Sequence, residues 1–294
     1  MTYRNSMARR ATDFAVGLGA LAVLLPFASG AAQQQRGTPD PNAPRLMVVV
    51  FRSADKNAGV KATDAVRDKI ADDFSLKQLY VLPKADVNAN LEASGFPTNE
   101  ALAAHDARAL GQQLRADEYI SGVVTNQGGQ MRVSAQMILT RDNTLTQPLG
   151  VYQVTKPDQA ADRISKEFQA AQKAFTAERD CVNAARDKKY AEAEAAARRG
   201  IAAYPKTTLA RICLANVYVT QRDQDTTNTA HVRTYNDSAL VAAREILAVD
   251  SLSQPALRIQ YAGLQAAGKR DSATDVLLRL VGADPTNSRL LEQV

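Results

Sequence analysis

Residues with the chemistry of an active site are few in this chain, and their spacing fits no catalytic or metal-binding motif. Its two histidines, His105 and His231, belong to no His-Glu-x-x-His or zinc-ligand spacing. The segment 223–228 has the acidic start of a calcium loop but lacks the glycine and the distal glutamate of such a loop. Neither a glycine-rich phosphate loop nor a nucleophile elbow is present. The sequence therefore predicts a protein that is not an enzyme and uses no cofactor or metal.

The first 32 residues have the pattern of a signal peptide. An arginine pair at 9–10 precedes an apolar stretch over 14–27, and small residues follow. We expect cleavage after Gly30 or Ala32, export to the periplasm or the cell exterior, and no transmembrane span in the mature chain. An uncleaved anchor is the alternative, although the apolar stretch is short for a span of about 20 residues.

Composition indicates a folded chain that does not bind nucleic acid. Hydrophobic residues make up 45% of the chain, which is ordinary for a globular protein. The 36 basic and 31 acidic side chains are mixed along the sequence, whereas a nucleic-acid-binding protein needs a dense basic stripe. Residues 33–45 contain three prolines and no apolar periodicity, so they are predicted to form a flexible linker.

Hydrophobic patterning over 46–156 predicts an α+β domain of order β-α-β-α-α-β-β-β, with helices against one face of a mixed sheet. The apolar run 46–51 is typical of a strand buried on both faces. Alternation of apolar and polar residues over 130–139 predicts a half-buried strand, paired with 119–125 across the turn Asn126–Gly129. The other expected elements are a strand at 79–82, helices at 60–76, 84–94 and 99–114 with Asn99 as an N-cap, and a last strand near 151–153.

Three motifs follow one another inside this predicted domain. They are Asp106-Ala-Arg-Ala-Leu-Gly111, Leu114-Arg-Ala-Asp-Glu-Tyr-Ile-Ser-Gly122 and Arg132-Val-Ser-Ala-Gln-Met-Ile138. Together they resemble the amino-terminal domain of TolB-like proteins over about 46–155, with Glu118 as an extra residue in the second motif. The resemblance implies an assembly or recruitment module of the cell envelope, without catalytic residues.

The region 157–294 is predicted to form an all-α solenoid of tetratricopeptide repeats. Pro205, Ser251 and Pro285 recur at intervals of 46 and 34 residues, which is a 34-residue period with an insert of 12. A 34-residue period is that of the helix–turn–helix units of tetratricopeptide arrays, which are usually protein-docking surfaces. A generic alanine-rich helical bundle is the alternative. The expected repeats are 174–207, 208–253 and 254–287, with a separate helix 157–172 in front and a solvated loop at the insert, near 222–233.

In such arrays the first helix of each repeat lines the concave face. The predicted contact positions there are Arg186, Leu209, Ile212, Asn216, Val219, Arg258 and Gln265. They form a mixed polar and apolar surface suited to a protein segment with a negative end, although ordinary solvated helix faces have the same composition. Cys181 and Cys213 lie on the same helices, so a disulfide is one expectation in an oxidising compartment and two buried thiols are the other.

These features predict an exported, non-catalytic adaptor that recruits a protein or peptide partner in the cell envelope. Two other functions stay open. One is an envelope hydrolase with carboxylates in the cleft between the domains, because acidic side chains are numerous. The other is an oligomeric structural subunit.

Overall fold

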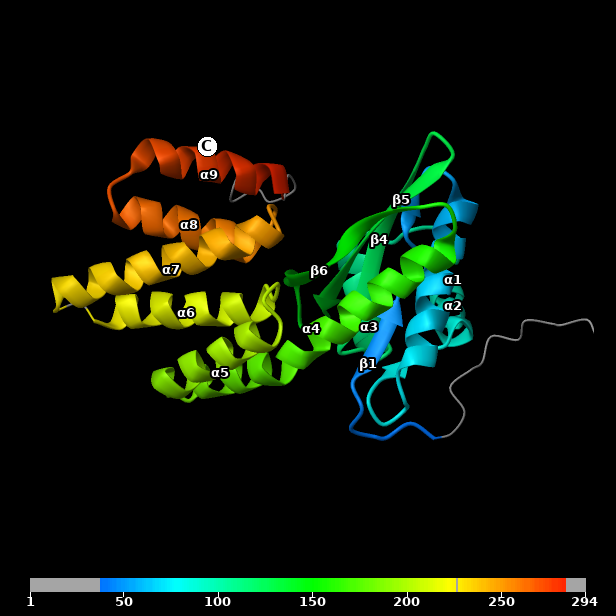
Figure 1. Cartoon of the computed structure of the whole chain (residues 1–294), viewed down its shortest axis with the longest axis horizontal. Helices are drawn as coiled ribbons and strands as arrows, with labels where there is room; N and C mark the ends of the chain where they lie inside the picture. Colours follow the sequence, from blue (N-terminus) through cyan, green and yellow to red (C-terminus); the bar gives the residue numbers. More distant parts are fainter. Residues whose placement is uncertain (1–37, 226, 284–294) are drawn as a thin grey trace, which may run out of the picture. The chain divides into compact units, whose positions relative to one another are not determined.

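A computed structural model describes residues 38–225 and 227–283 of the chain. The predicted signal peptide, the first five residues of the predicted linker and the end of the third predicted repeat lie outside the described residues. Six strands and nine helices follow one another in the described part (Figure 1). They are β1 (Arg45–Val48), β2 (Arg52–Ser53), α1 (Lys56–Asp73), β3 (Tyr80–Val81), α2 (Lys84–Ala93), α3 (Ala104–Gln113), β4 (Glu118–Gln127), β5 (Gln130–Leu139), β6 (Asp142–Val154), α4 (Pro157–Arg186), α5 (Tyr190–Ala203), α6 (Leu209–Gln224), α7 (Thr229–Val249), α8 (Gln254–Ala266) and α9 (Arg270–Ala283).

The strands form one mixed sheet of order β3-β1-β4-β5-β6. β1 pairs in parallel with both β3 and β4, whereas β4, β5 and β6 are antiparallel. The short strand β2, which the sequence did not predict, pairs in parallel with β4 beyond the end of β1. The turn between β4 and β5 is tighter than expected, because Gly128 and Gly129 alone form it with φ angles of +56° and +81°.

Helices cover both faces of the sheet, so the expectation that they lie on one face was wrong. Leu46 and Val48 of β1 pack in the core that contains α1 and α4. Met47 and Val49, which point the opposite way along the same strand, pack in the core of α2 and α3. The continuous apolar run of β1 therefore reflects burial on both sides.

The third helix of the α+β region begins later than predicted. α3 starts at Ala104 and Ala103 is its N-cap, so Asn99 does not cap it. Pro97 is followed by a turn instead, and Glu100 binds Lys56 at the start of α1 at 2.5 Å. The residues between α2 and α3 therefore form a connection rather than the first helical turn.

A single helix of 30 residues, α4, replaces the separate helix 157–172 and the first helix of the first predicted repeat. No glycine interrupts it and its one proline is at the first position, where a helix tolerates it. Its first half packs on α1, where Ser165 Oγ donates to Asp73 Oδ2 at 2.6 Å and Phe168 contacts Phe74 edge to face. Its second half pairs with α5, so α4 belongs to both the α+β region and the helical region.

The helical region consists of the successive hairpins α4/α5, α6/α7 and α8/α9. A disulfide between Cys181 and Cys213 joins α4 to α6. A short repeat array would consist of three such hairpins. That they form a tetratricopeptide solenoid remains a prediction. Among the described residues, none of the helices has the length and apolar character needed to cross a membrane.

Most of the predicted insert is helical, so the solvated loop expected near 222–233 is shortened to the connection between α6 and α7. α6 continues to Gln224 and α7 begins at Thr229, so the extra residues lengthen both helices. Asn228 caps α7 by accepting from the backbone N–H groups of Ala230 and His231.

No group of three or more metal-ligating side chains occurs in the described ranges.

Candidate binding site

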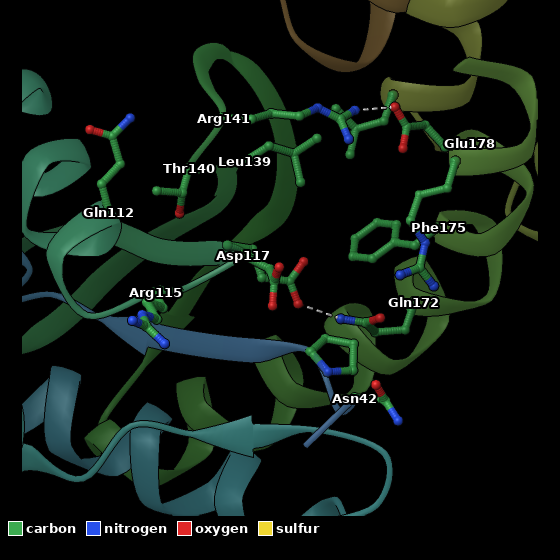
Figure 2. Close-up of a pocket in the computed structure, with 15 residues that line it drawn as sticks. Asn42, Gln112, Arg115, Asp117, Leu139, Thr140, Arg141, Gln172, Phe175 and Glu178 are labelled. Carbon is green, nitrogen blue, oxygen red and sulfur yellow. Dashed lines mark hydrogen bonds and ion pairs between the residues drawn. The ribbon is translucent and has the colours of Figure 1, made fainter. Parts of the chain in front are cut away.

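A cavity of about 490 Å³ lies where the sheet meets the helical region (Figure 2). We call it the junction cavity. Its lining comes from the segment before β1, the end of α3, the start of β4, the turn between β5 and β6, the middle of α4 and the first residue of α6. Its volume is within the range of ligand pockets.

Glu118, the first residue of β4, is the most deeply buried acidic group of the junction cavity. Glu118 is only 3% exposed, and Gln172 Nε2 of α4 donates to its Oε1 at 2.7 Å. Burial raises the pKa of Glu118 to about 8, an effect that Asp117 increases and that Gln172 and Arg179 oppose. The carboxyl group therefore carries its proton at neutral pH and can donate a hydrogen bond.

A second buried carboxyl group, that of Glu178, faces the junction cavity from α4. It forms an ion pair with Arg141 from the turn between β5 and β6 (Figure 2). Burial raises the pKa of Glu178, although Arg141 acts in the opposite direction. Asp117, at the same end of the cavity as Glu118, accepts from the backbone N–H of Arg45 at 2.8 Å. The cavity thus contains three carboxyl groups, and each has a partner.

The wall of the junction cavity on α4 leads into the surface predicted to bind a partner. Gln172, Phe175 and Arg179 line the cavity at spacings of three and four residues, which places them on one face of the helix. The same spacing continues to Val182, which is 36% exposed, and to Arg186, which is exposed. The cavity and this surface therefore share one helical stripe.

The other predicted contact residues divide into exposed and buried ones. Asn216, Arg258 and Gln265 are exposed, and Val219 is half-buried. Leu209 and Ile212 are only 2% and 3% exposed, so their predicted role in an open groove was wrong.

The reason for this burial lies in the packing of α6, which contacts α4, α7, α8 and β6. Thr208, just before α6, binds Gln147 of β6 through its backbone N–H at 2.8 Å. This contact holds the first turn of α6 against the sheet, where Leu209 lines the junction cavity.

Sequence reasoning missed most of the junction cavity. Of its polar residues it singled out Glu118 alone, as an extra residue in a TolB-like motif. Arg115, Arg141, Gln172 and Arg179 had no signal in the sequence, because they come together only through the packing of α4 beside the sheet.

Comparisons with known proteins establish no family for the chain. No family model matches it, and no curated protein does. Among solved structures, the first TPR of Spaghetti (RPAP3) bound to an HSP90 peptide is similar over 42% of this chain and 90% of its own, at 18% identity and a TM-score of 0.35. The C-terminal domain of LpoB from Escherichia coli matches 38% of this chain and 81% of its own, at 12% identity and 0.30. TolB from Acinetobacter baumannii matches 45% of this chain but only 28% of its own, at 14% identity and 0.29. These weak similarities include both kinds of domain that the sequence resembles, and they assign the chain to neither.

Proposed function

We propose that this protein is a non-catalytic adaptor of the cell envelope that binds a protein segment along α4, α6 and α8, the first helices of its hairpins. The observation that carries the proposal is the exposure of polar side chains at the predicted contact positions. Asn216 and Arg258 are exposed on α6 and α8, and neither side chain has a hydrogen bond or ion pair within the described part of the chain. Such groups are available to a partner.

The chemistry of these side chains fits an extended or helical segment with a negative end. The amide of Asn216 donates and accepts, so it can bind both groups of a peptide backbone. The guanidinium groups of Arg186 and Arg258 can pair with a carboxylate. Export is part of the proposal and is supported by the signal-peptide pattern of residues 1–32.

A capture experiment tests this role. The whole chain serves as bait in an envelope extract, in the wild-type form and as the double variant Asn216→Ala/Arg258→Ala. Arg244→Ala is the control, because Arg244 is an equally exposed arginine on the second helix α7. We expect the wild type and the control to retain a partner that the folded double variant loses. Retention of the same partners by all three baits would place the interface elsewhere.

A hydrolase is the second candidate, because Asp117, Glu118 and Glu178 line one cavity. A buried glutamic acid that keeps its proton near neutral pH is suited to general acid catalysis. We favour the binding role because Glu178 is engaged by Arg141 and Glu118 by Gln172. The variant Glu118→Gln separates the two functions: a hydrolase loses turnover of its glycan or peptide substrate, whereas the adaptor keeps its partner.

A further inference from the structure

The basic groups of the junction cavity differ from its acidic groups in having unused binding capacity. Arg115 and Arg179 both line the cavity. In the part of the chain that the structure describes, neither guanidinium group has a hydrogen bond or an ion pair. The acidic groups, as described above, all have partners. Asp117 accepts only from a backbone N–H, so its charge offsets one of the two free guanidinium groups; the remaining charge is positive, and an anion would complement it.

The interior of the junction cavity offers both a polar group without a partner and an apolar wall. Thr140 is 4% exposed, and its Oγ1 is buried without a hydrogen-bond partner. Buried hydroxyl groups usually have a partner, and because Thr140 lines the cavity, rotation of its side chain would bring this one to a ligand. Leu139, Phe175 and Leu209 line the same cavity. An occupant would thus meet hydrogen-bonding groups and hydrocarbon together.

The backbone conformation at Arg115 sets where its side chain lies. Arg115 follows the end of α3 with a φ angle of +54°, and the Ala116 N–H closes the turn by donating to the Gly111 carbonyl at 2.8 Å. This left-handed position after a helix is usually occupied by glycine, because other residues are strained there. Lys188 has the same conformation after α4 without lining the cavity, so the backbone alone assigns no role; at Arg115 it places the guanidinium group beside the cavity.

We propose that the junction cavity binds a small organic acid, meaning a carboxylate on an apolar body. Arg115 and Arg179 supply the positive charge that attracts the carboxylate. The protonated Glu118 and, once its side chain rotates toward the cavity, Thr140 Oγ1 can donate hydrogen bonds to the ligand, and Phe175 provides a contact surface for the apolar part. This site and the adaptor surface adjoin along α4, but none of the exposed contact residues Arg186, Asn216 and Arg258 lines the cavity, so the two can be tested separately.

The first test uses 3-phenylpropionate as the probe and the neutral 3-phenylpropionamide as its control ligand. Binding to the whole chain is measured by titration in ligand-observed NMR at pH 6.5. We expect the acid to bind in the millimolar range or tighter and the amide to bind at least about tenfold more weakly, which corresponds to about 1.4 kcal/mol. Equal affinities for acid and amide, or no binding of the acid, would overturn the proposal.

A matched pair of variants then locates the site. Arg115→Gly removes the guanidinium group and relieves the strained backbone, so we expect weaker binding of the acid by about tenfold without a lower melting temperature. Lys188→Gly is the control, because Lys188 has a φ angle of +60° just after α4 and does not line the cavity. It makes the same backbone change and should leave affinity unchanged. If Arg115→Gly and Arg179→Gln both keep wild-type affinity, the carboxylate binds elsewhere and the proposal fails.

A peptide probe identifies the source of the carboxylate. Acetyl-Ala-Ala-Phe with a free carboxyl end is compared with its amide and with 3-phenylpropionate. Weaker binding of the free peptide than of 3-phenylpropionate supports a small acid. Tighter binding of the free peptide that Arg115→Gly abolishes supports the carboxylate site but overturns the small-acid assignment in favour of a chain end.

Discussion

The buried carboxyl group of Glu118 should make the stability of the folded protein depend on pH. Burial raises the pKa of Glu118 from its ordinary value of 4.5 to about 8. Between these two pH values the folded chain holds a proton that the unfolded chain has released. The free energy of unfolding therefore falls as pH rises through this interval, and the contribution of Glu118 is lost above about pH 8.

The size of the effect follows from the width of the interval. Each pH unit between 4.5 and 8 corresponds to about 1.4 kcal/mol, so the largest possible loss is about 5 kcal/mol. Glu118 borders the junction cavity, so relaxation of its surroundings can lower the cost of the buried charge. We therefore expect a loss of roughly 2–4 kcal/mol, a large part of the stability of an ordinary domain.

The variant Glu118→Gln isolates this effect, because glutamine is neutral at every pH and its Oε1 can still accept from Gln172. The other charged groups that line the cavity with Glu118 are Asp117 from the chain before β4, Arg115 after α3, Arg141 beside β5, and Glu178 and Arg179 from α4. Burial also raises the pKa of Glu178, so both proteins lose some stability in the same direction.

Urea unfolding of wild type and variant at pH 5, 7 and 9 measures the difference. We expect the wild type to lose more free energy of unfolding between pH 5 and pH 9 than the variant does. The second variant, Glu178→Gln, should retain the Glu118 part of the loss. Identical losses in wild type and Glu118→Gln would mean that Glu118 ionises in the folded protein as it does in water, and the reasoning from burial would be wrong.

Three further predictions concern stability. Replacing both Cys181 and Cys213 by alanine removes a disulfide between residues 32 apart in sequence, which should lower the free energy of unfolding by roughly 3–4 kcal/mol through loop-closure entropy. An unchanged midpoint of urea unfolding would contradict this. Tyr218→Ala should lower the free energy of unfolding by about 3–5 kcal/mol, because Tyr218 is buried and its hydroxyl contacts Glu194 of α5. Tyr235→Ala on α7 should lower it by about 1–2 kcal/mol, because that ring is half-buried. Equal melting temperatures of these two variants would refute the difference. Gly59→Ala should destabilise the folded protein by about 1–3 kcal/mol, although alanine has the better helix propensity, because the added Cβ would lie 2.4 Å from the Phe51 carbonyl oxygen. A raised melting temperature would show that α1 moves away from Phe51 at little cost.

The sequence predicted most elements of the sheet because the burial of a strand shows in the local pattern of apolar and polar residues. The alternation over 130–139 corresponds to β5, and the apolar run 46–51 overlaps β1. The face that each helix covers is not a local property. Val87 and Leu91 mark an apolar side of α2, but nothing in their spacing says which side of the sheet that helix meets.

The junction cavity was beyond prediction for a related reason. Its walls depend on α4 continuing from the sheet into the hairpins, over a length of about 45 Å for 30 residues. The 34-residue period predicted two helices separated at 172–174, whereas α4 runs through these residues without a break. Arg115 and Glu178 line one cavity only because the helix is unbroken.

The disulfide gives α4 a fixed relation to α6 at the point where the junction cavity gives way to the exposed surface. Cys181 lies between Arg179, which lines the cavity, and Val182, which is exposed. Its partner Cys213 lies one turn before Asn216 on α6. The bond therefore sets the position of the stripe on α4 relative to the polar side chain on α6. A partner that bridges the two helices would meet preorganised groups, which lowers the entropy lost on binding.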